Sequence, residues 1–192
     1  MKHVRDFQRL PKQRLAPGWT LLESLLVLML VGVLLSLGAA TWAPVRQKYQ
    51  LQAQAEDLLS AVLLAHSEAL KRGVRVTACV SSDGLHCLAS GEWTQGWMLF
   101  EDADGNALRS DTEALIGVHA AMPEGLQATG NGTMAHYVSY GPNGRSLTVT
   151  GAYQFATITL CRTSTQVNAG GKLVVNAVGK ARLEAATLVS CS

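Results

Sequence analysis

The sequence predicts an α+β protein in which a long N-terminal helix packs on an antiparallel β head. Three observations predict this fold. An apolar run covers 19–43, and apolar residues spaced three and four apart follow it up to position 72. From position 74 onward, short alternating segments are separated by turn residues. A helix followed by a series of strands is typical of the α+β class.

The stretch 44–72 has the pattern of an amphipathic helix. Gly73 follows Lys71 and Arg72 directly, which is typical of a helix end, because Gly adopts the left-handed conformation and cations favour the negative end of the helix dipole. We therefore expect one face of this helix to pack on the head. That face consists of Leu51, Ala55, Leu58, Val62, Ala65 and Ala69.

The head is expected at 73–192, as a β-sheet or sandwich. This length is sufficient for one compact domain. Turn signals such as Asp104-Gly105-Asn106 and Gly141-Pro142-Asn143-Gly144 separate the expected strands. These strands are 74–80, 97–100, 115–118, 136–140, 155–161 and 172–175.

The run 19–43 contains a single charged residue, Glu23, and is long enough to cross a bilayer at ~1.5 Å per residue. The basic segment 1–18 precedes it, and a positive flank beside an apolar run stays in the cytoplasm. We expect a single transmembrane pass with the head on the far side. A secretory signal has a shorter apolar region and would be disrupted by Glu23. A plain membrane anchor carrying a ligand-binding β domain is the other alternative, and it leaves Gly18 and Glu23 unexplained.

The charge balance changes once the first 18 residues are set aside. The whole chain has 16 basic and 14 acidic residues and a net charge of +2. The segment 1–18 holds 5 of those basic residues and 1 of the acidic ones, which leaves 11 against 13, or −2, for 19–192. A broad basic surface is therefore not expected, and any nucleic-acid binding would have to be local.

The four cysteines predict two disulfides, because an even count is typical of an exported chain. Four cysteines allow three pairings. Cys79 and Cys87 flank a turn signal at 81–84, which favours a local bridge, and Cys161–Cys191 then follows. No C-x-x-C pair is present, so a zinc site is not expected.

Gly18 and Trp19, followed by Glu23, resemble the processing site of type IV prepilins and pseudopilins. The resemblance implies that a prepilin peptidase cuts after Gly18 and that Trp19, where the family usually has Phe, becomes the methylated N-terminus. It also implies that Glu23 pairs with the N-terminal amine of a neighbouring subunit during assembly. The predicted organisation is therefore a cleaved leader at 1–18, an assembly helix at 19–43, an amphipathic helix at 44–72 and a head at 73–192.

Several further stretches are similar, in order and spacing, to minor pilins and pseudopilins of the FimT, FimU and GspH kind. They are Ala65-His66-Ser67-Glu68-Ala69-Leu70-Lys71-Arg72-Gly73, Trp93-Thr94-Gln95-Gly96-Trp97 and Tyr140-Gly141-Pro142-Asn143-Gly144-Arg145. The resemblance implies a filament subunit without enzymatic activity or cofactor, anchored in the inner membrane with a periplasmic head and extracellular once it is in a pilus. Its expected partners are other pilins, the prepilin peptidase and the membrane. A FimT-like minor pilin near the tip of a type IV pilus is predicted; a GspH-like pseudopilin of type II secretion is the alternative.

Gly179-Lys180-Ala181-Arg182 resembles the G-R-x-R motif that is implicated in binding DNA for uptake by FimT-like minor pilins. Two cations two residues apart on a strand point the same way and can meet successive phosphates. Lys172 joins them if it lies on the same surface, and Glu184 would oppose them. The alternative is an ordinary solvated edge strand, on which Lys discourages pairing with another sheet.

Four residues have the spacing of a calcium-binding loop. Asp102, Asp104, Asn106 and Glu113 fall at positions one, three, five and twelve of such a loop. Position six requires Gly for a sharp turn and is Ala107 here, and no helices are expected on either side. We expect a hairpin between strands and no metal, with calcium kept as an alternative.

Overall fold

The computed structural model describes residues 18, 20–163 and 170–186, so the leader segment 1–17, Trp19 and Cys191 lie outside the described residues. The chain divides into two compact units, Met1–Ala43 and Pro44–Ser192. One helix, α1 (Leu21–Arg72), belongs to both units. Among the described residues, no helix reaches the length and apolar character that a membrane span requires.

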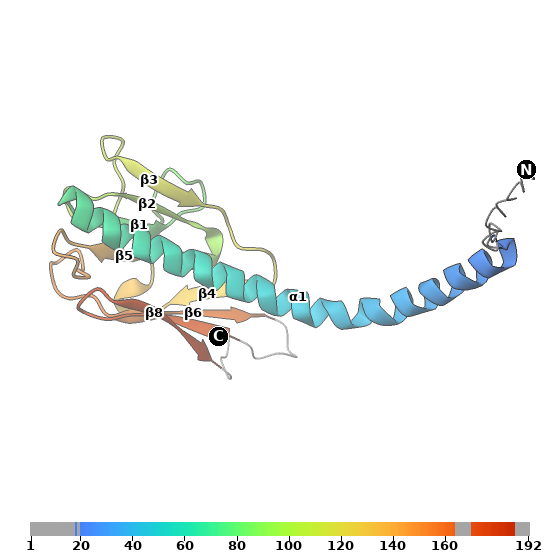
Figure 1. Cartoon of the computed structure of the whole chain (residues 1–192). Helices are drawn as coiled ribbons and strands as arrows, with labels where there is room; N and C mark the ends of the chain where they lie inside the picture. Colours follow the sequence, from blue (N-terminus) through green and yellow to red (C-terminus); the bar gives the residue numbers. More distant parts are fainter. Residues whose placement is uncertain (1–17, 19, 164–169, 187–192) are drawn as a thin grey trace, which may run out of the picture. The chain divides into compact units, whose positions relative to one another are not determined.

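Two four-stranded antiparallel sheets form the head (Figure 1). The first has the strand order β3-β2-β1-β5 and the second β4-β6-β7-β8. Two short 3₁₀ helices, Trp93–Gln95 and Gly132–Met134, lie in the connections. The strands are β1 (Val76–Val80), β2 (Trp97–Glu101), β3 (Leu115–His119), β4 (Leu126–Gly130), β5 (Tyr137–Tyr140), β6 (Ala156–Arg162), β7 (Gly170–Val175) and β8 (Ala181–Ala186).

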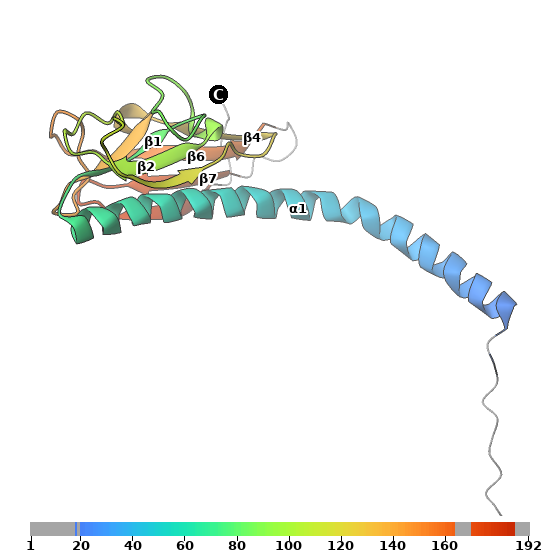
Figure 2. The ribbon, with the colours of Figure 1, turned by 90° about the horizontal axis from the view of Figure 1, so that it is seen from above.

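The part of α1 that belongs to the second unit runs along one side of both sheets (Figures 1 and 2). The predicted apolar face is confirmed, because Leu58, Val62, Ala65 and Ala69 are fully buried. Side chains from this helix and from both sheets belong to one continuous core. Since small residues let a helix backbone approach a sheet closely, the two alanines bring the end of α1 against the head.

Two tryptophans anchor the core between the sheets. Trp93 and Trp97 are both fully buried. The indole Nε1 of Trp93 donates a hydrogen bond to the carbonyl oxygen of Met134 at 3.0 Å, so its polar atom is satisfied inside the core. The strands predicted around 74–80, 97–100, 115–118, 136–140, 155–161 and 172–175 are all present.

One strand of the second sheet was not predicted. β4 contains Gln, Ala and Gly, which are weak strand formers, and only its pairing with β6 defines it. β8 lies at the edge of the same sheet, as the edge-strand interpretation of 180–182 expected. The edge position leaves one side of β8 without a strand partner among the described residues.

The predicted local disulfide is confirmed: Cys79 and Cys87 are bonded, with Cα atoms 5.6 Å apart. Cys79 lies on β1, so the bridge fixes the loop after this strand to the sheet. Cys161 is also disulfide-bonded. Its predicted partner, Cys191, lies outside the described residues, so the second pairing stays a prediction.

Candidate functional site

The predicted assembly residue, Glu23, lies in the first turn of α1 and is exposed. Its backbone N–H donates to the side-chain oxygen of Thr20 at 3.2 Å, so Thr20 caps the helix. An acidic side chain here is also favoured by the positive end of the helix dipole. Within the described residues, the Glu23 carboxylate has no ion pair, which leaves it available to a cation from outside this part of the chain. Gly18 is exposed just before the helix.

Large apolar side chains surround the first unit's part of α1. From position 21 to position 35 their exposed fractions range from 39 to 82%. They point in all directions around the helix rather than to one face. A helix that is apolar all round is normally covered by lipid or by other protein.

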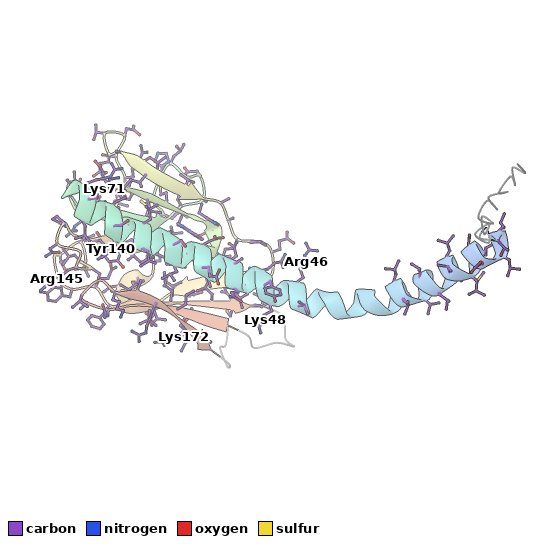
Figure 3. The ribbon with its side chains drawn as sticks, in the orientation of Figure 1. Arg46, Lys48, Lys71, Tyr140, Arg145 and Lys172 are labelled. Atoms are coloured by element: carbon purple, nitrogen blue, oxygen red, sulfur yellow. A yellow bond between two sulfur atoms is a disulfide. The ribbon has the colours of Figure 1, made fainter. Side chains whose placement is uncertain are left out.

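Two of the predicted basic residues, Lys172 (Figure 3) and Arg182, lie on strands of the second sheet, and Lys180 lies in the turn that precedes β8. Lys172 of β7 pairs in register with Glu184 of β8, and Val174 pairs with Arg182. Leu173 and Val175 are buried toward the core, so their neighbours Lys172 and Val174 face outward. Lys172 and Arg182 are consequently diagonal neighbours on one surface. This is the condition under which Lys172 was expected to join the cations of the motif.

Glu184 partly neutralises this surface, as the sequence also suggested. Its Oε1 atom lies 2.8 Å from Nε and 2.6 Å from Nη2 of Arg182. Both side chains are about half exposed, so water screens this ion pair and its contribution to stability is small. The pair leaves Arg182 already in contact with an acid.

The glycine of this motif has a packing role. Gly179 is buried in the turn between β7 and β8, with φ of 88°, and its N–H donates to the Asn176 carbonyl oxygen at 2.9 Å. A Cβ atom there would lie 2.0 Å from the carbonyl oxygen of Gly144. Only glycine fits this conformation and this contact. The same turn presents Lys180 as an exposed side chain.

A further cation, Arg145, lies next to this turn and was not predicted as a site residue. Its guanidinium carbon is 5.3 Å from the centre of the Tyr153 ring, and Tyr153 is 50% exposed. The loop that carries Arg145 contacts Gly179 through Gly144, and the Ser146 hydroxyl donates to the Asn176 carbonyl at 2.9 Å. The sequence gave no indication that Arg145 lies near the motif, because some 35 positions separate its loop from the motif.

The four residues with calcium-loop spacing lie in the connection between β2 and β3. This connection is a hairpin, as expected, because β2 and β3 are antiparallel neighbours. Carboxylate oxygens of Asp102, Asp104 and Glu113 lie within 4.8 Å of one another. The side chain of Asn106 instead bonds back to Asp104 and to its own loop. The structure thus gathers three of the four predicted oxygen ligands.

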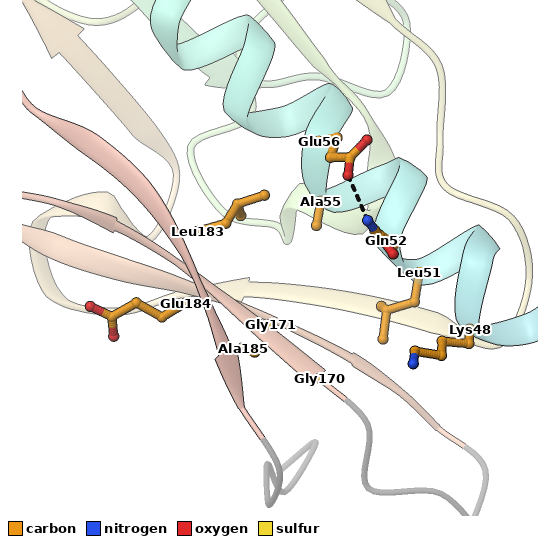
Figure 4. A pocket seen from close by; sticks show the side chains of 10 residues that line it. All are labelled: Lys48, Leu51, Gln52, Ala55, Glu56, Gly170, Gly171, Leu183, Glu184 and Ala185. Atoms are coloured by element: carbon orange, nitrogen blue, oxygen red, sulfur yellow. Dashed lines mark hydrogen bonds between the residues drawn. The ribbon is translucent and has the colours of Figure 1, made fainter.

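A pocket of about 450 Å³ lies between α1 and the strands β7 and β8 (Figure 4). Leu183 points from β8 toward α1, whereas Glu184 points away from the helix. A hydrogen bond of 2.8 Å joins Gln52 and Glu56 at its rim. Apart from Lys48 and Glu184, the rest of the lining is small or apolar. The lining residues are Lys48, Leu51, Gln52, Ala55, Glu56, Gly170, Gly171, Leu183, Glu184 and Ala185.

Comparison with known structures identifies the fold. The minor pilin FimU of the type IV pilus of Pseudomonas aeruginosa matches with a TM-score of 0.54 and 18% identity, over 72% of this chain and 90% of that chain. The minor pseudopilin EpsH of the type II secretion system of Vibrio cholerae matches with a TM-score of 0.49 and 14% identity, over 71% of this chain and 97% of that chain. No match was found among curated proteins.

The family model for the type II transport protein GspH matches residues 54–179. This range covers more than half of the chain and includes the buried residues of α1 from Ala55 onward, the strands β1 to β7 and the turn at Gly179. The chain therefore belongs to the GspH family of minor pilins and pseudopilins, which are structural subunits and not enzymes.

Proposed function

We propose that this chain is a FimT-like minor pilin, incorporated at or near the tip of a type IV pilus through its N-terminal helix. One observation carries the incorporation into a filament: the exposed apolar side chains at 21–35 surround a helical segment that contains a single acid, Glu23. Packing such helices side by side removes this apolar surface from water and provides a neighbour for the carboxylate.

The proposed order of events starts in the inner membrane. The leader 1–18 stays in the cytoplasm, the apolar segment 19–43 is held in the lipid, and the head lies in the periplasm. The prepilin peptidase cuts between Gly18 and Trp19 and the new amine is methylated. Before assembly, lipid covers the apolar side chains; in the filament, the helices of other pilins replace it, and the head becomes extracellular.

A GspH-like pseudopilin of type II secretion is the alternative, since the matching family carries that description and the fold is common to both systems. We expect a strain that lacks this chain to lose surface pili and pilus-dependent movement while it continues to secrete its exported enzymes. Electron microscopy of the cell surface and assays of enzyme in the medium check this. Normal piliation together with lost secretion would contradict the pilus assignment and support the alternative.

We further propose that the outer face of β7 and β8 binds double-stranded DNA. Lys172, Lys180 and Arg182 supply positive charge on one surface, and the aromatic ring of Tyr153 and the cation of Arg145 lie next to the same turn. Phosphate contacts by such residues give salt-dependent binding without sequence preference. The acid Glu184 limits the affinity for DNA, because its carboxylate forms an ion pair with Arg182.

The double substitution Lys180→Ala and Arg182→Ala is expected to weaken DNA binding by the full chain in detergent and to reduce its salt dependence. Loss of two phosphate contacts lowers the slope of log affinity against log salt by roughly 2. Glu184→Gln is expected to act in the opposite direction, because it releases Arg182 from its ion pair. Fluorescence anisotropy with a labelled duplex at several salt concentrations measures both effects.

Lys71→Ala provides the matched control, since Lys71 is an exposed cation on α1 and does not belong to the motif. Its binding should equal that of the parent. Equal binding by the parent and the double variant, or no binding by either, would remove Lys180 and Arg182 from the proposal.

A further inference from the structure

The β2–β3 hairpin combines three carboxylates of unequal exposure. Asp102 directly follows β2 and is fully buried, Glu113 is 8% exposed, and Asp104 lies at the surface. Their nearest oxygens lie within 4.8 Å of one another. Three negative charges at this distance repel one another strongly unless a cation lies between them.

The buried carboxylate of Asp102 is only half satisfied. Its Oδ2 accepts hydrogen bonds from the Thr77 hydroxyl at 2.6 Å and from the Ala107 N–H at 3.2 Å. Its Oδ1 is buried and has no hydrogen-bond partner among the described residues. Because an unpaired buried carboxylate oxygen is costly, this atom requires a ligand.

The loop backbone makes the turn that a calcium loop needs, although it lacks the expected glycine. Ala107, at position six, has φ of 59° and is the single non-glycine residue with positive φ in the described part of the chain. Asp104 accepts a hydrogen bond from the N–H of Asn106 at 3.1 Å, and Glu113 accepts from Ala103 and Ser110, both at 2.9 Å. These bonds orient the acidic side chains and leave lone pairs on each carboxylate.

We propose that this hairpin binds a calcium ion through carboxylate oxygens of Asp102, Asp104 and Glu113. Calcium–oxygen distances of about 2.3–2.6 Å place two ligand oxygens up to roughly 5 Å apart, and the observed 4.8 Å fits this limit. Calcium takes six to eight oxygens, and backbone carbonyls and water supply the remainder. Magnesium fits poorly, since it requires shorter bonds and a stricter octahedron.

A neighbouring cation limits the affinity. Arg75 donates from Nη1 to the carbonyl oxygens of Gly105 at 3.0 Å and Thr148 at 3.4 Å, and its charge lies close to Asp102. Three carboxylates and a nearby guanidinium correspond to the weak class of extracellular calcium modules, with Kd of about 10⁻⁴–10⁻³ M. Such a site is filled where calcium is abundant outside the cytoplasm.

Isothermal titration calorimetry of the metal-free full chain in detergent tests the proposal. The parent is expected to bind one calcium ion per chain and to gain thermal stability on binding, whereas Asp104→Ala binds roughly tenfold or more weakly. Because Asp104 is exposed, this variant keeps the fold, and an unchanged Tm in the presence of chelator verifies that. Asp111→Ala, an exposed acid of the same hairpin outside the cluster, is the matched control and retains parental affinity.

Three outcomes would overturn the assignment. The parent shows no saturable heat and no shift of Tm with calcium; or Asp104→Ala binds calcium as tightly as the parent; or magnesium binds as tightly as calcium. The first removes the site, the second moves it elsewhere, and the third excludes calcium as its specific ligand. None of them depends on whether the chain acts in a pilus or in a secretion system.

Discussion

Replacement of Glu23 by Ala is expected to exclude the chain from filaments while the leader is still removed. In the proposed filament, the carboxylate of Glu23 meets the N-terminal amine of a neighbouring subunit within apolar surroundings. Removal of one partner from a buried ion pair costs roughly 3–5 kcal/mol, because the other charge stays buried and unpaired. The incorporated fraction should therefore fall by about a hundredfold or more.

Quantitative blotting of sheared filaments against the membrane fraction measures this loss, and mass spectrometry of the N-terminus checks that cleavage after Gly18 and methylation of Trp19 persist. Glu23→Gln retains the shape of the side chain and should fail like Ala, which isolates charge as the cause. Ser24→Ala, one residue further along the same helix turn, is the matched control and should enter filaments normally. Parental incorporation of both Glu23 variants would contradict the electrostatic account.

Replacement of Gly179 by Ala is expected to unfold the end of the second sheet and to destabilise the head by at least about 3 kcal/mol. The positive φ of 88° is strained for any residue with a Cβ atom, at a cost of roughly 1–3 kcal/mol. The added methyl group would also lie 2.0 Å from the Gly144 carbonyl oxygen, which belongs to the backbone and has little room to move. Thermal or denaturant unfolding of the full chain in detergent gives the difference in free energy.

Gly151→Ala separates the two contributions. Gly151 also has positive φ, at 81°, but a Cβ atom there would have no neighbour within 4 Å. We expect the strained backbone alone to destabilise this variant, by about 1 kcal/mol. If both variants are equally destabilised, the contact with Gly144 has no energetic role. The result also shows which part of the basic motif serves the fold and which part remains free to bind a ligand.

Periodicity predicted much of the fold. The buried face of α1 follows from apolar residues three and four apart, and Gly73 marks its end because it takes positive φ. β4 escaped prediction, because Ala128 and Gly130 carry no strand preference of their own and are held there by pairing with β6. Local patterns thus determine the elements that bury their own side chains, whereas tertiary pairing determines the rest.

In the candidate site, too, local patterns predicted some features and tertiary contacts determined the others. The spacing of Lys180, Arg182 and Glu184 was sufficient to predict a shared surface and an opposing acid, because alternation along a strand is a local property. Arg145 could not be predicted, since only the contact between two distant loops brings it to the same turn. The features on which the proposed calcium site rests could not be predicted for a comparable reason: the burial of Asp102 and the positive φ of Ala107 are consequences of the whole hairpin.

The single core that joins α1 to both sheets has a mechanical consequence. A filament under tension transmits force along its helices, and the head of this subunit is attached to its helix by apolar packing at Leu58, Val62, Ala65 and Ala69. Shear along this interface loads two sheets at once, so many weak contacts yield together rather than one after another. The helix that enters the polymer thus also forms part of the core of the head, and pulling it away would unfold the head.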